Sequence, residues 1–434
     1  MRLKLHYQIL IAMVLGAGVG LPLNILSGMG RISAEWPRTA AAYGKSVGDV
    51  FLQLLSMIVA PLILTSLITG VTGTGNLKGL GRLGGRTLAY YLCTSMIAII
   101  TGILVFNVIQ PGKNSNLADL QESVQPVESP VVAEEQTLGE TMFNQVMNLI
   151  PKNPFAALAD PGNKSILGVI FFAILFGVFV SLVGGETGAL LTRFFSGAFE
   201  VMMRMTMAII KTAPVGVLGF MLYASAGKGL AVFAALGWYM LTVAIALSVH
   251  AFITLPLLLL ILGRRSPWGY AQSMSPALLT AFSTASSNGT LPLTITCVEK
   301  RAGISNRISS FVLPLGATIN MDGTALYEAV AVLFIAQVTG HELGLSQQMI
   351  VAVTALMASI GAAGIPHAGT VMMVVVLNAV GLPIEYVGLI LAVDRVLDMF
   401  RTSVNVWSDS TACAVVARFE RESTEPPSHT GSPV

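Results

Sequence analysis

Long apolar runs separated by short polar loops dominate the chain up to residue 263. A helix needs roughly 20 predominantly apolar residues to cross a hydrocarbon core of about 30 Å. Five runs of this length carry no acidic or basic residue: 7–30, 50–77, 87–112, 165–185 and 229–263, the last apart from His250. The run 194–227 is more amphipathic, because Glu200, Arg204 and Lys211 interrupt it. We predict six spanning helices here, the first a retained helix because its apolar stretch is long for a signal peptide.

The charges in the loops predict the orientation of these helices. Lys78, Arg82 and Arg86 share one loop without acidic residues, whereas 113–164 is rich in Asp and Glu. Positive loops tend to stay in the cytoplasm, so we expect both termini on that side. The composition of 113–140 predicts an external loop, and 419–434 is expected to be a disordered cytoplasmic tail.

The uncharged run 266–298 is not predicted to be a single span, because basic residues flank both of its ends, at 264–265 and 300–301. Both ends are therefore expected on the cytoplasmic side. Its middle, 286–292, reads Ser-Ser-Asn-Gly-Thr-Leu-Pro and is rich in helix breakers. We predict a re-entrant helical hairpin whose tip lines protein or water near mid-membrane. Its two arms are expected at 272–284 and 291–298.

A second hairpin is predicted over 343–384, which carries no acidic or basic residue apart from His367. Glycines and a proline interrupt this run at 361–369. By the orientation above it enters from outside, so two hairpins of opposite entry meet near the midplane. That arrangement is typical of secondary transporters built from inverted repeats and broken helices. Two kinked ordinary spans are the alternative interpretation.

Composition places the whole chain in a bilayer. Hydrophobic residues make up 54% of its 434 residues and charged residues 11%, against about a quarter charged in soluble proteins. The net charge of +2 comes with scattered basic residues, so nucleic-acid binding is not expected. Cys93, Cys297 and Cys413 lack CxxC spacing and nearby histidines, which leaves them as packing residues.

Asp322 lies at membrane depth within Asn320-Met321-Asp322-Gly323-Thr324. A central aspartate costs on the order of 2.5–3.5 kcal/mol on insertion scales, so it persists when paired, bound to a cation or functional. Asn320 and Gly323 would loosen the helix and free carbonyl oxygens, which hard cations accept as ligands. We predict an ion site here, with a structural polar patch as the alternative.

The last apolar segment carries a polar stripe. At 100° per residue its members fall within roughly 100° of arc: Asp394, Asp398, Arg401, Thr402, Asn405 and Asp409. Carboxylates in this stripe suit an ammonium group or a cation, and the guanidinium suits a carboxylate. An amino acid with a second carboxylate needs this mixture. A buried ion-pair network joining helices is the alternative, above all for Asp394 with Arg395.

These residues resemble the glutamate/aspartate transporter family, or dicarboxylate/amino acid:cation symporters, which includes archaeal aspartate and animal excitatory amino acid transporters. The resemblance runs nearly end to end and rests on five segments: Tyr90-Tyr91-Leu92-Cys93-Thr94-Ser95, the Ser-rich tip with Gly289-Thr290-Leu291-Pro292, 313–324, the Ala-Ala-Gly-Ile-Pro loop at 362–366, and 397–409.

The resemblance implies an all-α polytopic membrane protein with eight transmembrane helices, two re-entrant hairpins of opposite entry and a glutamate-transporter-like elevator fold. The protein would form a homotrimer. A single membrane unit, 1–434, would comprise a scaffold part at 7–77 and 141–227 and a sliding transport part at 78–112 and 229–418. The outer hairpin would serve as the extracellular gate.

Site residues follow from the resemblance, position by position. Asp398 would hold the substrate amino group, Arg401 its side-chain carboxylate, and Asn405 with Ser286 and Ser287 its main carboxylate. The pocket would be completed by Thr324, Ile365, Gly369 and Thr402. Sodium would take three ligand sets: Asp409 with carbonyls of Gly316, Asn320 and Asn405; carbonyls of Thr318, Ser359, Ile360 and Ala362; and Tyr91, Thr94, Ser95, Asn320 and Asp322.

Departures from the family pattern bear on these sites. Ala285 stands where archaeal members have Arg, and Asn288 where Ser is frequent. Trp407-Ser408 replaces a frequent x-Gly before the last aspartate and is expected to alter the nearby cation site. His367 stands where many members have Gly. It either makes gating sensitive to pH or faces external water, and we prefer the second interpretation.

Three rival functions were weighed. An intramembrane serine hydrolase using Ser286 or Ser287 lacks a recognisable base, and a channel does not explain a fixed arginine among aspartates. A proton-coupled or dicarboxylate-selective relative stays open, although Asp398 would repel cargo without an ammonium group. We therefore expect a secondary active symporter, not an enzyme, that imports L-aspartate or L-glutamate with Na⁺. It is expected in a plasma membrane, with the bacterial inner membrane favoured.

Overall fold

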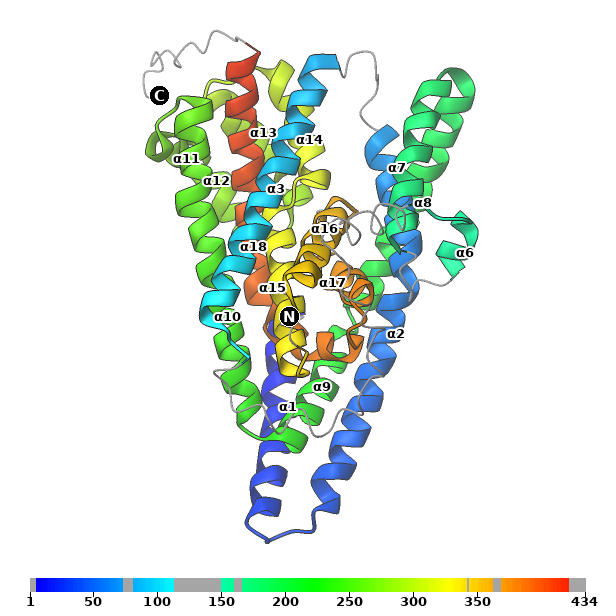
Figure 1. The fold of residues 1–434 in the computed structure, drawn as a ribbon, viewed down its shortest axis with the longest axis vertical. Helices are drawn as coiled ribbons and strands as arrows, with labels where there is room; N and C mark the ends of the chain where they lie inside the picture. The colour runs from blue at the N-terminus through cyan, green and yellow to red at the C-terminus, as the bar shows by residue number, and fades with distance from the viewer. Residues whose placement is uncertain are drawn as a thin grey trace, which may run out of the picture.

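The computed structural model describes residues 5–72, 81–112, 150–159, 166–341, 343–361 and 368–420, and every regular element in them is helical. The predicted loop at 113–140 and the tail from 421 lie outside the described residues, as does the tip of the second predicted hairpin at 362–367. Helices α1 (Leu5–Gly28) and α2 (Glu35–Thr72) form the lower tip of Figure 1, and α2 then runs up its right side.

One group of helices packs around α9 and α2. Helix α9 (Ala213–Lys228) lies against both α1 and α2, while α7 (Ile166–Val183) and α8 (Gly185–Ile210) pack against α2. The short α6 (Pro154–Ala159) packs against α7. Glycines bring α2 and α9 together, because a Cβ at Gly44 would lie 2.6 Å from the carbonyl oxygen of Gly219.

A second group packs around α15 (Asp322–Val338) and α18 (Val387–Phe419). It contains α3 (Gly81–Ile109), α10 (Ala231–Val249) and α14 (Asn306–Ile319). After α10 the helix continues through π-helical turns η1 (His250–Thr254) and η2 (Leu259–Gly263), with α11 (Leu255–Leu258) between them. Every residue of α15 except Gln337 is buried, so this helix lies at the centre of the protein.

The helix bounds refine the predicted spans. Helix α2 begins at Glu35, well before the apolar run at 50. The predicted span 194–227 is two helices, α8 and α9, bent by 46°. Pro214 in the first turn of α9 explains the bend, since proline has no amide hydrogen to donate.

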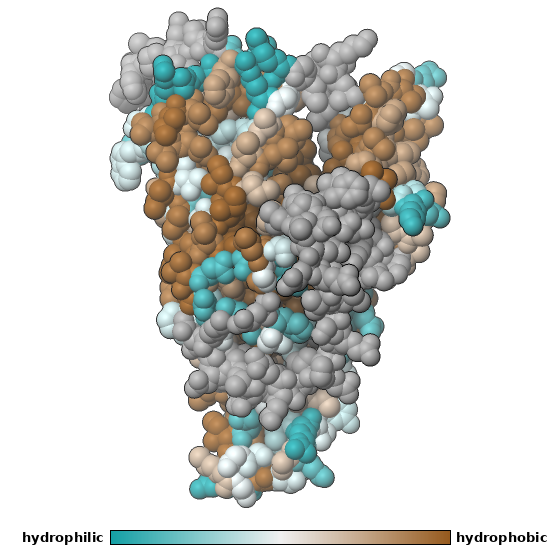
Figure 2. All heavy atoms as spheres, viewed as in Figure 1, coloured by the Kyte–Doolittle hydropathy of each residue, from teal (hydrophilic) through white to brown (hydrophobic). Residues whose placement is uncertain are grey.

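Four described helices are long and apolar enough to cross a membrane, and the bent pair of α8 and α9 would make a fifth. Figure 2 shows hydrophobic residues over much of the upper and middle surface, with hydrophilic residues at the upper end, at the lower tip and in smaller patches at mid-height. The protein is therefore a multi-pass membrane protein, and the number of eight spanning helices stays a prediction.

Residues 267–296 form a helix–turn–helix. Helix α12 (Pro267–Thr284) and α13 (Ser287–Thr296) pack against each other, and Ala285 turns the chain with a left-handed φ of 50°. The side chain of Ser286 caps α13 by accepting the amide hydrogen of Gly289. Turn η3 (Cys297–Arg301) follows α13, and both arms are longer than predicted. Re-entry of this hairpin into a membrane stays a prediction.

The second predicted hairpin corresponds to α16 (Leu345–Gly361) and α17 (Ala368–Ala379), which pack against each other and against α15. Turn η4 (Ile384–Tyr386) then leads into α18. Figure 1 shows α16 and α17 at mid-height beside α15, while α12 and α13 approach from the upper end.

Candidate functional site

A break between α14 and α15 creates the centre of the site. Asn320 and Met321 leave helical geometry, with ψ angles of 89° and 59°. The predicted loosening at Asn320 is therefore observed, whereas Gly323 lies inside the first turn of α15 and does not interrupt it. The break faces α3 and the middle of α18, which both pack against these helices.

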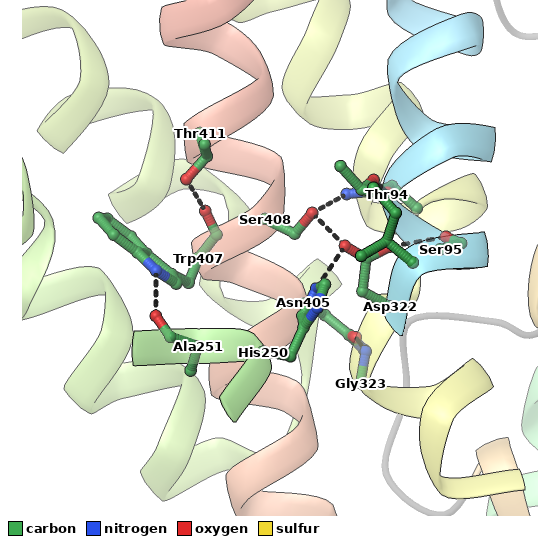
Figure 3. A network of polar contacts seen from close by, with 12 residues as sticks. Thr94, Ser95, His250, Ala251, Asp322, Gly323, Asn405, Trp407, Ser408 and Thr411 are labelled. Atoms are coloured by element: carbon green, nitrogen blue, oxygen red, sulfur yellow. Dashed lines mark hydrogen bonds and ion pairs between the residues drawn. The ribbon is translucent and has the colours of Figure 1, made fainter. Parts of the chain in front are cut away.

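Asp322 is fully buried and receives three hydrogen bonds from protein side chains (Figure 3). Ser95 on α3 donates to Oδ1 at 2.6 Å, and Ser408 on α18 donates to Oδ2 at 2.6 Å. Nε2 of the buried His250 lies 3.1 Å from Oδ2. Because a carboxylate only accepts hydrogen bonds, the imidazole donates from Nε2. These donors hold the carboxylate in one orientation.

Asp409 lies on the other side of the break. Its Oδ1 accepts a hydrogen bond of 2.9 Å from Nδ2 of Asn320. A Cβ added at Gly316 would lie 2.5 Å from Oδ1 of Asp409 and 2.7 Å from the hydroxyl of Tyr91. Three of the predicted sodium ligands therefore meet at Gly316. Thr94 is also close, since its hydroxyl lies 3.4 Å from Oδ1 of Asn320.

Arg401 is buried between two carboxylates one and two turns earlier on α18. Its Nε donates to Asp398 Oδ1 at 2.9 Å, and its Nη1 donates to Asp394 Oδ1 at 3.0 Å. The guanidinium lies over the ring of Tyr327, 4.3 Å from its centroid. Arg395 adds a longer ion pair, 3.7 Å from Asp398 Oδ2. A guanidinium presents five donors, so this one retains the geometry to take a further carboxylate.

The start of α15 is joined to α18 beside Arg401. Asn405 accepts the amide hydrogen of Gly323 at 2.8 Å and donates to the hydroxyl of Thr324 at 3.1 Å. A Cβ at Gly323 would lie 2.5 Å from the carbonyl oxygen of Arg401, so only glycine permits this approach. Thr402, next on α18, is also buried.

The hairpin helices reach the same region. A Cβ at Gly369, in the first turn of α17, would lie 2.9 Å from Arg401 Nη1 and 3.0 Å from Cγ2 of Thr324. Helix α13, with Ser287 buried in its first turn, packs against α18. Ser286 caps that helix, so its hydroxyl oxygen is engaged at the tip.

Comparison with known proteins decides the family. Residues 5–419 match the sequence profile of the sodium:dicarboxylate symporter family. The chain belongs to this family.

Its relatives include excitatory amino acid transporter 3 of Mus musculus, 35% identical over 97% of this chain and 87% of the relative. The Homo sapiens protein of the same name is 38% identical over 87% of this chain and 79% of the relative. A putative sodium-dependent excitatory amino acid transporter, glt-4 of Caenorhabditis elegans, is 35% identical over 96% of this chain and 91% of the relative. The chain is therefore a membrane transporter and not an enzyme, as the sequence predicts.

The second predicted set of sodium ligands in this symporter lies only partly within the described residues. Ser359 is buried near the end of α16, followed by Ile360, and Thr318 lies on α14, which packs against α16. Ala362 falls outside the described residues, as do Ile365 of the substrate pocket and His367. The roles assigned to all these residues stay predictions.

Three residues of this symporter received too little weight in the sequence analysis. His250 enters the prediction from sequence only as an exception in an apolar run, and Glu328 does not enter it. Glu328 is fully buried, and neither carboxyl oxygen has a hydrogen-bond partner among the described residues. Ser408 was expected, with Trp407, to alter the nearby cation site, which stays a prediction; the structure adds that its hydroxyl donates to Asp322. A titratable group inside an apolar run was the available signal for the first two.

Proposed function

We propose that this chain imports acidic amino acids, L-aspartate or L-glutamate, together with Na⁺. The observation that carries the proposal is the buried guanidinium of Arg401, held between Asp394 and Asp398 and bordered by Gly369 and Thr324. Such a site offers one cation and two anions within a few ångströms. An amino acid with a second carboxylate complements both.

Cargo binding would exchange one set of ion pairs for another. The side-chain carboxylate of the cargo would pair with Arg401, and the ammonium group of the cargo would pair with Asp398. Neither Arg401 nor Asp398 would then be left unpaired. Leaving one buried charge without its partner would cost about 3–5 kcal/mol. Asn405, with Ser286 and Ser287 at the tip of α12 and α13, would hold the main carboxylate. The pocket would be completed by Thr324, Thr402, Gly369 and Ile365.

Sodium is proposed to bind at oxygen atoms around the break between α14 and α15. Asp409 lies against Gly316 and Tyr91, and Asp322 lies against Ser95, which supports two of the three ligand sets. Carbonyl groups freed by the break at Asn320 add neutral oxygen ligands, which suit a hard monovalent ion. The name of the family and the name of the nematode relative both refer to sodium.

An elevator mechanism is proposed for the movement. Helices α1, α2, α7, α8 and α9 pack largely on one another, while α3 and α10 to α18 pack around α15 and α18. This grouping supports a scaffold part, 7–77 and 141–227, and a transport part, 78–112 and 229–418. The proposal includes a homotrimer, re-entrant hairpins at 267–296 and 345–379, cytoplasmic termini and a plasma membrane location, with the bacterial inner membrane favoured.

Reconstitution into liposomes tests the proposal. Uptake of labelled aspartate is measured with an inward sodium gradient, with equal sodium on both sides, and with a pH gradient alone. We expect accumulation only with the sodium gradient, competed by glutamate. Uptake driven by the pH gradient and indifferent to sodium would instead establish the proton-coupled alternative.

A further inference from the structure

A continuous line of hydrogen bonds joins the two buried carboxylates of the proposed sodium sites. Asn320 Nδ2 lies 2.9 Å from Asp409 Oδ1 and 3.0 Å from the hydroxyl oxygen of Ser408. Ser408 Oγ lies 2.6 Å from Asp322 Oδ2. All four side chains are at most 3% exposed, so water does not compete with these bonds. Figure 3 shows Ser408 pointing from α18 toward Asp322.

The chemistry of the four groups fixes the direction of each bond. The amide of Asn320 has two hydrogens on Nδ2, and it donates one to Asp409 and one to Ser408. The hydroxyl of Ser408 accepts that hydrogen and donates its own to Asp322. The carboxylates of Asp322 and Asp409 only accept hydrogen bonds, so the direction of the hydrogen bonds between them is fixed. The orientation of one group therefore sets the orientation of its neighbour.

A cation at either carboxylate competes with these donors for the lone pairs of the carboxylate oxygens. Sodium binds oxygen lone pairs, so an ion at Asp409 competes with the Asn320 amide, and an ion at Asp322 competes with the Ser408 hydroxyl. Once the amide turns away from Asp409, its hydrogen bond to Ser408 is disturbed as well. The first ion thereby rearranges the donors that the second ion must otherwise displace, which favours positive cooperativity.

We propose that the Ser408 hydroxyl couples the cation sites at Asp322 and Asp409. This inference rests on the proposed function, because it takes both aspartates as sodium ligands, and it assigns to Ser408 a role in cooperativity. Ser408 is a positioning residue here, acting through Asn320 and Asp322.

Ser410 offers a matched control two residues further along α18. It is fully buried like Ser408, and its hydroxyl donates to the carbonyl oxygen of Trp407 at 2.8 Å within the same helix. Ser410→Ala therefore removes the same atom from the same kind of environment without touching the line between the carboxylates. Ser408→Thr keeps the hydroxyl and tests rescue.

The test is a sodium titration of the full-length protein in nanodiscs without cargo, at constant ionic strength maintained with choline. The thermal unfolding midpoint reports binding, so the readout does not depend on transport. We expect a steep sodium dependence for the wild type. Ser408→Ala should give the shallower curve of independent sites and shift the half-saturating concentration by about fivefold or more. Ser410→Ala and Ser408→Thr should keep the steepness.

Two outcomes overturn the coupling. One is an unchanged steepness in Ser408→Ala, and the other is an equal loss in Ser410→Ala, which would mean a general packing effect. A wild-type curve already as shallow as that of independent sites also rejects it while leaving sodium binding intact. A wild-type protein that does not respond to sodium at all would instead reject the proposed sodium coupling itself.

Discussion

At the scale of single residues, Arg401 is the group on which cargo choice is expected to depend. We predict that Arg401→Thr lowers the affinity for aspartate about 100-fold or more, since each factor of ten corresponds to about 1.4 kcal/mol. The physical reason is that the variant removes the guanidinium proposed to pair with the cargo side-chain carboxylate, and with it the ion pair of Arg401 to Asp394. Competition of labelled aspartate uptake by unlabelled aspartate measures the change.

Arg395→Thr is the control for this variant, because Arg395 is on the same helix and makes only a longer ion pair to Asp398. It should change aspartate affinity much less. Wild-type affinity in Arg401→Thr would contradict the role assigned to Arg401, and binding of a neutral amino acid by that variant would strengthen it.

Gly316 is predicted to be intolerant of a methyl group. Alanine there would place a carbon 2.5 Å from Asp409 Oδ1 and 2.7 Å from the hydroxyl of Tyr91, so the carboxylate must move. Overpacking of this kind costs about 1–3 kcal/mol, and we expect the half-saturating sodium concentration for uptake to rise about tenfold. Gly237→Ala is the control, since nothing lies within 4 Å of its added carbon.

The sequence predicted the polar stripe of α18, because helical periodicity relates residues within one helix. It did not predict the contacts between helices. His250 and Asp322 are 72 residues apart, and Ser408 and Asp322 are 86 apart. Periodicity carries no information on which faces of distant helices meet. Within α18, by contrast, the stripe places Asp394 and Arg401 on one face, and the structure pairs them; the alternative pairing of Asp394 with Arg395 rested only on their adjacency in sequence.

At the scale of elements, the helix breaks were the best-predicted features. The break at Asn320 lies where the pattern placed it, and the turn at 285–286 lies at the start of the predicted breaker run 286–292, whose remaining residues are helical in α13. The lengths of the arms were underestimated, because Ser266 caps α12 at the end away from the turn and Ser286 caps α13 directly at the turn, so both helices begin earlier than predicted. An apolar run does not reveal where a serine side chain caps a helix, so the pattern did not predict where these helices begin.

The turn of the first hairpin provides a test at this scale. Ala285 has a left-handed φ of 50°, which costs a residue with a Cβ about 1–2 kcal/mol. Ala285→Gly removes that strain and loses a buried methyl worth about 0.8 kcal/mol, so the net change should be near zero. Ala281→Gly, in the interior of α12, loses its methyl and about 1 kcal/mol of helix propensity. It should lower the thermal midpoint clearly.

Thermal unfolding in detergent compares the two variants directly. If Ala285→Gly is destabilised as much as Ala281→Gly, the left-handed turn is not a source of strain, and the tip of the hairpin has another conformation in solution.

At the scale of the whole molecule, ligand binding should stabilise the fold. Helices α3, α14, α15, α17 and α18 all contribute to the proposed sites, so cargo and sodium bridge elements that otherwise separate on unfolding. A ligand at 100 times its Kd adds about 2.7 kcal/mol. We predict that aspartate raises the thermal midpoint only when sodium is present, and that leucine does not. Stabilisation by aspartate in choline would contradict the linkage.

The sequence predicted a helical membrane protein and located both helical pairs, because hydropathy and charge report directly on the bilayer. Division into two groups of helices depended on the family resemblance. No local pattern distinguishes α9, which packs against α1 and α2, from α10, which packs against α3 and α18. Which helices pack together depends on the fit of their surfaces, such as Gly44 against Gly219.

The ion pairs of α18 have a consequence for the unloaded protein. Arg395 and Arg401 supply two positive charges, and Asp394 and Asp398 supply two negative ones, so this cluster is electrically balanced before cargo arrives. A carrier must return empty after each delivery, and an unbalanced charge carried through hydrocarbon would slow that return. If Arg401 binds cargo as proposed, Asp394 and Asp398 would also balance its charge during the return of the empty transport part.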